Sequence, residues 1–206
     1  MENKATEPKF RKRRTKKELE EIIWAAFERL VIKGGFNSIT LVKLANEAGV
    51  EPPVIYKRFE NMDDLFEQYT KRKDFWLDKS ASIDPGVSPK ENQIKLLTDL
   101  IDNLYDNEIM QRLLLWGLND TNKITRHIAM NREFENSFMI EYFNKAFKNS
   151  GLNINIANSI LIAGIYYLIL QRKVATFSSV DYNKEETKEQ MKQTVRDMIN
   201  KLFNDV

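Results

Sequence analysis

The sequence predicts an all-α protein of about nine helices, and three observations lead to that prediction. Apolar residues recur at the i, i+3 and i+4 positions of a helix in almost every segment. No segment shows the strict alternation of a half-buried strand. The 206 residues include only 7 Gly and 5 Pro, which are too few for the many tight turns of an all-β fold.

The composition excludes several classes of site. With no Cys and one His, the chain has no disulfide, no thiol nucleophile and no ordinary multi-His metal site, so we expect neither a metal nor a cofactor. The start of the chain lacks the apolar segment of a secretory signal. The longest uninterrupted apolar run, residues 160–170, has 11 residues, whereas a membrane-spanning helix needs about 20. These features predict a soluble, cytoplasmic protein that does not associate with a membrane.

The net charge of +2 is unevenly distributed along the chain. Residues 1–17 hold eight Lys or Arg and two Glu, a net charge of +6, so the remaining residues carry −4. A basic arm on a mildly acidic body favours contact with a polyanion. We expect residues 1–14 to form a flexible arm, with Arg11, Arg13 and Arg14 as its candidate DNA contacts.

Capping residues indicate where the first helices begin and end. Thr15 and Glu18 have the spacing of a capping box, and Gly34-Gly35 ends the first helix. Thr40 can cap a second helix, which Gly49 ends. The helices predicted along the chain span residues 15–34, 40–48, 52–59, 61–77, 90–106, 108–118, 121–149, 152–177 and 184–204.

Residues 41–59 have the spacing of a helix-turn-helix. Gly49 lies at the turn, where the backbone is expected to need a positive φ. A small helical pair inside any helical bundle can show the same pattern, so these residues alone leave DNA binding and plain packing equally open. The apolar positions expected to lock the two helices together are Leu44, Ala48, Val50 and Ile55.

The third helix has distinct inner and outer faces. At about 100° per residue, Ile55 and Phe59 face inward, and Pro53, Val54 and Lys57 point the opposite way. A helix in the major groove presents its outward face to base edges and its flanks to phosphates. The outward face is therefore the candidate for base contacts.

Charged and hydroxyl side chains around that face are the other candidate DNA contacts. Lys57 is the best candidate for a base contact, and Tyr56 and Arg58 on the flanks are better placed for phosphate. Thr40 and Lys43, at the start of the second helix, can also reach the DNA backbone. The alternative for Lys57 and Arg58 is an ordinary solvated helix face.

The order and spacing of several short segments resemble a known family. The segments are Gly-Gly-Phe36, Ile39-Thr40, residues 44–50 (Leu-Ala-Asn-Glu-Ala-Gly-Val), residues 55–59 (Ile-Tyr-Lys-Arg-Phe) and Leu65-Phe66. Together, residues 15–70 resemble the DNA-binding domain of TetR-type (TetR/AcrR) transcriptional regulators. The resemblance implies a three-helix DNA-binding domain at residues 15–61 and a C-terminal helical domain at residues 62–206. It further implies a homodimeric repressor that a small-molecule effector releases from a palindromic operator in double-stranded DNA.

This chain departs from the family at two places that matter for phosphate binding. The family usually has Ser, Lys, Gly and Thr before the tyrosine, whereas this chain has Glu51-Pro52-Pro53-Val54. The prolines remove two backbone N–H donors, and Glu51 repels phosphate. A Lys that is common after the phenylalanine is Met62 here. We expect the basic arm to supply part of the lost attraction, and the apolar 52–54 segment to contact thymine methyl groups.

Bulky residues at helical spacing are the candidates for lining the effector pocket, although most such residues belong to a core. Trp116 and Tyr166 come first, because rings with polar groups suit a mixed ligand surface. Gly117 leaves space beside Trp116. The full set of candidates is Tyr105, Trp116, His127, Phe134, Phe138 and Tyr166.

The last two helices are the candidates for a dimer interface, which the resemblance also implies. The middle of residues 153–177 is apolar nearly all round, so it needs burial on more than one side. The last helix has an apolar seam with coiled-coil spacing. Packing within one chain is the alternative. The candidate interface residues are Ile160, Tyr167, Leu170, Met191, Val195, Met198 and Leu202.

Two further function classes compete with a ligand-responsive repressor. A TetR-fold ligand-binding module with weak or lost operator binding is favoured by the altered 51–54 segment. An enzyme is disfavoured, because no nucleophile–base pair, phosphate loop or metal-ligand spacing stands out.

Overall fold

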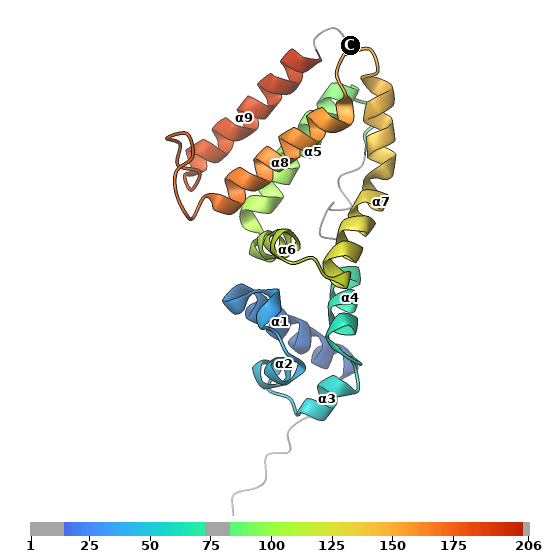
Figure 1. The fold of residues 1–206 in the computed structure, drawn as a ribbon, viewed down its shortest axis with the longest axis vertical. Helices are drawn as coiled ribbons and strands as arrows, with labels where there is room; N and C mark the ends of the chain where they lie inside the picture. The colour runs from blue at the N-terminus through green and yellow to red at the C-terminus, as the bar shows by residue number, and fades with distance from the viewer. Residues whose placement is uncertain (1–14, 73–82, 204–206) are drawn as a thin grey trace, which may run out of the picture.

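The computed structural model describes residues 15–72 and 83–203, which form two helical units along the long axis of the molecule (Figure 1). This described part contains nine α-helices, one 3₁₀ helix and no named strand, so the all-α prediction is confirmed. The elements are α1 (Lys16–Gly34), η1 (Phe36–Ser38), α2 (Leu41–Ala48), α3 (Pro52–Tyr56), α4 (Met62–Arg72), α5 (Pro89–Asp106), α6 (Glu108–Asn119), α7 (Lys123–Ala146), α8 (Ile154–Gln171) and α9 (Glu185–Leu202).

The helix caps lie where the sequence predicts them. The Thr15 amide donates to Glu18 Oε2 at 2.7 Å, and the Glu18 amide donates to Thr15 Oγ1 at 3.2 Å. Thr40 Oγ1 accepts from the Lys43 amide at the start of α2. Gly49 ends α2 with a φ of +61°, the left-handed conformation that glycine adopts most easily. The predicted capping box and turn are therefore confirmed.

Three helices are shorter than predicted, and one short element was missed. Helix α7 spans Lys123–Ala146 rather than residues 121–149. Helix α3 ends at Tyr56 rather than at residue 59. Helix α8 ends at Gln171 rather than at residue 177, and the chain then turns back through Ser178 and Ser179, whose φ values are +50° and +64°. The 3₁₀ helix η1 was not predicted. The predicted helical residues 73–77 lie outside the described residues, as does the predicted arm at 1–14.

The N-terminal unit has an aromatic core that includes α4. Ile23, Leu44 and Leu65 are fully buried in it, and the Tyr69 ring packs against Phe27 at a tilt of 45°, with ring centroids 4.3 Å apart. The packing of Leu65 and Tyr69 therefore joins α4 to the first three helices, although the predicted boundary at residue 61 placed it in the second domain.

The C-terminal unit is built around α5, which packs against both α8 and α9. Leu97 and Ile101 of α5 meet Ile169 of α8 and Ile199 of α9 in one buried cluster. At the end where α7 stops, Phe147 stacks on Phe203 with centroids 4.0 Å apart, which fixes the last turn of α9.

Helix α8 is apolar but largely uncovered. Among the described helices, it alone has the length and composition to cross a membrane, and 17% of its residues are buried. Ile160 is 66% exposed and Tyr167 is 52% exposed. A core helix of one chain would be mostly buried, so α8 is not covered in this chain as a core helix would be.

Candidate functional site

The α2–α3 pair has the geometry of a helix-turn-helix. The Val50 amide donates to Ala45 O at 3.0 Å and so closes the turn after α2. Ile55 and Phe59 are buried, whereas Pro53, Tyr56 and Lys57 are exposed on the outer side. The predicted inner and outer faces are therefore present, except that Val54 is half-buried and offers less surface than predicted.

The cations near this surface differ in whether an ion pair or a hydrogen bond already engages them. Arg58 forms an ion pair with Glu20 of α1 at 3.0 Å. The Lys43 ammonium donates to Ser38 O at 2.7 Å, while the exposed Thr40 hydroxyl oxygen caps α2. Lys57 is exposed and has no ion pair or hydrogen-bond partner for its side chain in the described part of the chain. Lys57 is thus the cation most available to a ligand here.

Ion pairs of this kind also hold the first turns of α1 in position. Glu20 also lies 3.6 Å from Arg72, and Glu21 lies 2.6 Å from Arg72, so the first turns of α1 are held against the end of α3 and against α4. The start of α1 therefore lies close to α3 and α4 (Figure 1). The predicted contacts Arg11, Arg13 and Arg14 precede Thr15 and lie outside the described residues.

Trp116 joins the two units and does not line a pocket. Its ring stacks on Phe36 with centroids 4.8 Å apart and lies 5.0 Å from Phe66. Its indole N–H donates to Asn37 Oδ1 at 2.7 Å, and the Asn37 amide in turn donates to Asp120. Trp116 is therefore part of the N-terminal core, which corrects its predicted pocket role. The neighbouring Gly117 faces open space, so it makes no room beside Trp116.

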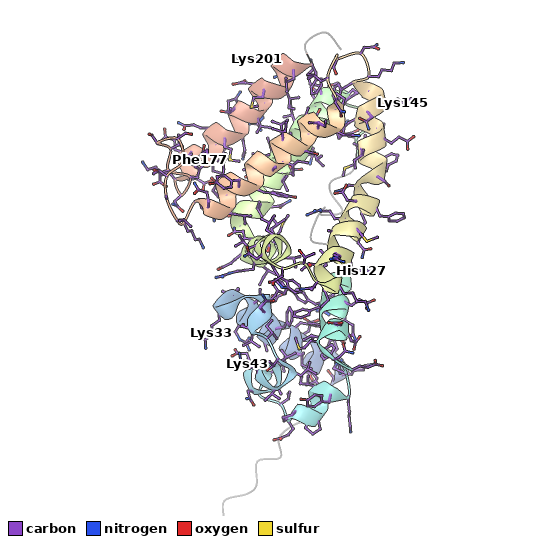
Figure 2. All side chains as sticks on the ribbon, viewed as in Figure 1. Lys33, Lys43, His127, Lys145, Phe177 and Lys201 are labelled. Carbon is purple, nitrogen blue, oxygen red and sulfur yellow. The ribbon has the colours of Figure 1, made fainter. Side chains whose placement is uncertain are left out.

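The other predicted pocket residues do not converge on one site. Phe134 and Phe138 of α7 are 81% and 68% exposed, which overturns their assignment as pocket lining within this chain. His127 is exposed and pairs with Asn131 on its own helix (Figure 2). The Tyr105 hydroxyl donates to the Tyr182 carbonyl at 2.9 Å in the loop before α9, and Tyr166 lies half-buried on α8.

The predicted seam of α9 is wrong for two of its four residues. Met191 and Val195 are 8% and 5% exposed and pack into the chain's own core. The inward row continues with Ile199, because a straight helix keeps i, i+4 neighbours on one face. Met198 and Leu202 stay exposed, as do Ile160 and Tyr167 of α8, while Leu170 is half-buried.

Sequence reasoning missed a buried amide in α5. Gln93 is 1% exposed, and its amide N–H donates to Asn158 of α8. Gln93 resembles a surface residue when taken alone. The signal that could have identified it is its position one turn before Leu97 and two before Ile101, at the head of the inward row of α5.

Comparisons with known proteins match the N-terminal unit at the sequence level. Residues 23–69 match the family described as bacterial regulatory proteins, tetR family. An uncharacterized HTH-type transcriptional regulator of Haemophilus influenzae is 42% identical over 60 residues, which are 29% of this chain. That match spans 32% of the relative, about a third of its length.

Several solved structures share the fold of this chain over both of its units. A proposed fatty acid metabolism regulator of Clostridium perfringens has a TM-score of 0.66 at 16% identity, over 90% of this chain and 98% of that one. The regulator FadR of Bacillus subtilis, solved with stearoyl-CoA, has a TM-score of 0.59 at 14% identity, over 91% and 99%. A TetR-family regulator of Haemophilus influenzae has a TM-score of 0.57 at 20% identity, over 90% and 98%. The sequence match to the tetR family is thus confined to residues 23–69, and the solved structures share the fold of both units.

Proposed function

We propose that this protein is a transcriptional repressor that binds a palindromic operator as a homodimer and releases it when a small molecule binds the C-terminal unit. The observation that carries the proposal is the α2–α3 pair, whose inner residues Ile55 and Phe59 are buried while Tyr56 and Lys57 are exposed. A helix with this outer face fits the major groove. The proposal places the protein in the cytoplasm with its DNA and gives it no enzymatic step.

The basic arm is the second DNA contact in this proposal. The ion pair between Glu20 and Arg58 holds the start of α1 beside the end of the recognition helix α3. Residues 11–14 are covalently close to Thr15, within about 15 Å at full extension. The arm can therefore reach the phosphates that flank α3, where Pro52 and Pro53 offer no N–H donors.

The exposed faces of α8 and α9 support a dimer. Ile156, Ile160 and Tyr167 lie along one face of α8, and Met198 and Leu202 are exposed on α9. Two copies of this pair can cover each other in a four-helix interface. Such an interface explains why an apolar helix is left uncovered in a single chain.

The proposed ligand response follows from the contact between the units. The B. subtilis regulator of similar fold was solved with stearoyl-CoA, which supports a small-molecule ligand for a protein of this fold. In a dimer, the two recognition helices must lie about 34–36 Å apart to enter successive major grooves. A ligand that favours another spacing shifts the dimer away from DNA. The Trp116–Phe36 stack is a direct route for that shift.

Fluorescence anisotropy with a labelled duplex from the region beside the gene tests DNA binding. We expect tight, salt-dependent binding to one palindrome and weaker binding to a scrambled duplex. Lys57→Ala should weaken binding to the palindrome about tenfold or more, because a base contact is worth about 1–3 kcal/mol. Lys145→Ala, at the far end of α7 (Figure 2), is the matched control. Equal binding to both duplexes would favour the ligand-binding module without operator binding.

Deletion of residues 1–14 tests the arm. We expect the plot of log K against log[salt] to flatten by about two units per dimer or more, since each neutralised phosphate contributes about 0.9. The measurement is the anisotropy titration repeated at four or more salt concentrations. An unchanged slope would contradict the role of the arm, whatever happens to the affinity.

A further inference from the structure

The start of α3 has no backbone N–H group free to bind a phosphate. Pro52 and Pro53, the first two residues of the helix, have no amide hydrogen. The third residue, Val54, donates its amide to the Glu51 carbonyl at 2.9 Å. The exposed Glu51 side chain adds a negative charge at the same end. If this end of α3 approaches DNA, contacts other than phosphate hydrogen bonds must hold it there.

An exposed apolar ring lies on the outer side of this helix. Pro52 and Val54 are half-buried, whereas Pro53 is exposed. The structure therefore narrows the apolar segment 52–54 to one side chain that is well placed to reach a base edge. The ring of Pro53 neither donates nor accepts a hydrogen bond, and its carbonyl already accepts from the Lys57 amide at 3.1 Å. The surface that Pro53 presents is thus apolar.

Lys57 lies one helical turn after Pro53 and on the same side, since its backbone keeps the helical conformation. It is exposed, and no ion pair or hydrogen bond engages its side chain within the described residues. Four residues of helix correspond to a rise of about 6 Å, and the base pairs of B-DNA are about 3.4 Å apart. The two side chains therefore meet base edges within about two base pairs of each other.

The major groove offers one apolar group to such a ring. Guanine, cytosine and adenine present hydrogen-bond donors and acceptors there, whereas thymine adds a methyl group. A proline ring pressed on a polar base edge removes water from that edge and returns no hydrogen bond, which costs free energy. On a thymine methyl group the same ring buries apolar surface, which is favourable.

We propose that Pro53 reads a thymine methyl group in each half-site of the operator, with Lys57 on a guanine within about two base pairs of it. The proposal rests on the operator binding proposed above and names the class of sequence that is bound. Lys57 donates to O6 and N7 of guanine, the commonest specific base contact of a basic side chain. Specificity at the thymine comes from its methyl group alone, because the proline ring makes no hydrogen bond to the base.

Removing single methyl groups from the operator tests the reading of thymine. Each thymine of the bound palindrome is replaced in turn by deoxyuridine, in both half-sites at once, which leaves every hydrogen-bonding group of the base in place. Fluorescence anisotropy measures the affinity of the full-length protein for each duplex. We expect deoxyuridine at one or two positions of the half-site to weaken binding about tenfold, since each buried methyl group contributes about fourfold. The other positions should change little.

Replacing Pro53 assigns the lost affinity to its ring. Pro53→Ala removes the ring but adds an N–H group that can bind phosphate, so the informative quantity is the ratio of thymine to deoxyuridine affinity within one variant. We expect this ratio to fall from about ten to about one in Pro53→Ala and to stay near ten in Lys57→Ala. Pro89→Ala, the same change at the first position of α5, is the matched control and should also keep the ratio.

A guanine analogue locates the contact of Lys57 in the same way. We expect 7-deazaguanine, which lacks the N7 acceptor, to weaken binding at a guanine within about two base pairs of the sensitive thymine. That effect should disappear in Lys57→Ala and persist in Pro53→Ala, because N7 is a partner of the lysine and not of the proline.

Three results would overturn the proposal: no thymine sensitive to loss of its methyl group, an unchanged ratio in Pro53→Ala, or a Lys57-dependent guanine farther away than stated. Any of these results, together with specific binding to the palindrome, overturns the reading of thymine and leaves the repressor function standing. If no duplex is bound specifically, the repressor function itself fails, and the proposed reading fails with it.

Discussion

Arg58 illustrates how one contact can change the role of a residue. Its guanidinium lies 3.0 Å from Glu20, and Arg72 approaches the same carboxylate at 3.6 Å. These side chains are partly exposed, so the pair adds little to stability. Its larger effect is electrostatic, because the carboxylate neutralises a cation beside the recognition helix. Glu20 therefore lowers the attraction of this surface for phosphate.

Replacing Glu20 tests that effect. Glu20→Gln should free Arg58 and steepen the salt dependence of operator binding by about one to two units per dimer. The measurement is the slope of log K against log[salt] from anisotropy titrations. Glu21→Gln is the matched control, since it removes the same charge but pairs only with Arg72 among these cations. An equal change in the control would mean that overall charge, and not Arg58, sets the slope.

Residues whose roles depend on distant partners could not be predicted from the sequence. Trp116 fits any apolar helix face, and its true partners Phe36 and Phe66 are 50 or more positions away in the chain. Glu20 and Arg58, which form an ion pair, are also far apart in the sequence, with a separation of 38 positions. The buried Gln93 looks like a surface residue, because its environment comes from α8 and not from its neighbours in sequence.

Helices with local start and stop signals were predicted well. Thr15, Thr40 and Gly49 act within one turn of chain, and each has the predicted capping or turn geometry. The errors occur at ends set by tertiary structure. The continued apolar pattern predicted α8 to reach residue 177, but the chain turns back through Ser178 and Ser179 to bring α9 against α5.

The turn between α2 and α3 gives a clean test of backbone conformation. A Cβ at Gly49 would meet no atom within 4 Å, so Gly49→Ala should cost stability only through its φ of +61°. The expected loss is about 1 kcal/mol in urea unfolding. Gly117→Ala is the control, because its Cβ also meets nothing but it lies inside helix α6, where alanine should add about 0.5–1 kcal/mol. Losses of equal size in both variants would contradict this account.

At the scale of the whole molecule, two groups of exposed apolar side chains lie on different helices of the C-terminal unit. One group consists of Ile160 and Tyr167 of α8 with Met198 of α9, and the other consists of Phe134 and Phe138 of α7. Only the first is part of the proposed dimer interface. The two groups can therefore be distinguished by charge insertion.

Ile160→Lys should convert the dimer into monomers at micromolar concentration, because it places a charge at the centre of the proposed four-helix contact. Light scattering coupled to gel filtration measures the mass, and operator affinity should fall with it, since one subunit contacts one half-site. Phe134→Lys adds the same charge at an exposed aromatic position on α7 and should stay dimeric. The interface would have to be placed on α7 if the two outcomes were exchanged.

The Trp116 contact also limits how the N-terminal unit can be moved into another protein. Leu113, Trp116 and Ile128 complete the core around Phe36 and Phe66, so a fragment cut after α4 would expose aromatic surface to water. A chimera that grafts this unit onto another effector protein should therefore carry residues 108–128 with it. The sequence module matched at residues 23–69 is thus smaller than the smallest part of this chain that has a closed core.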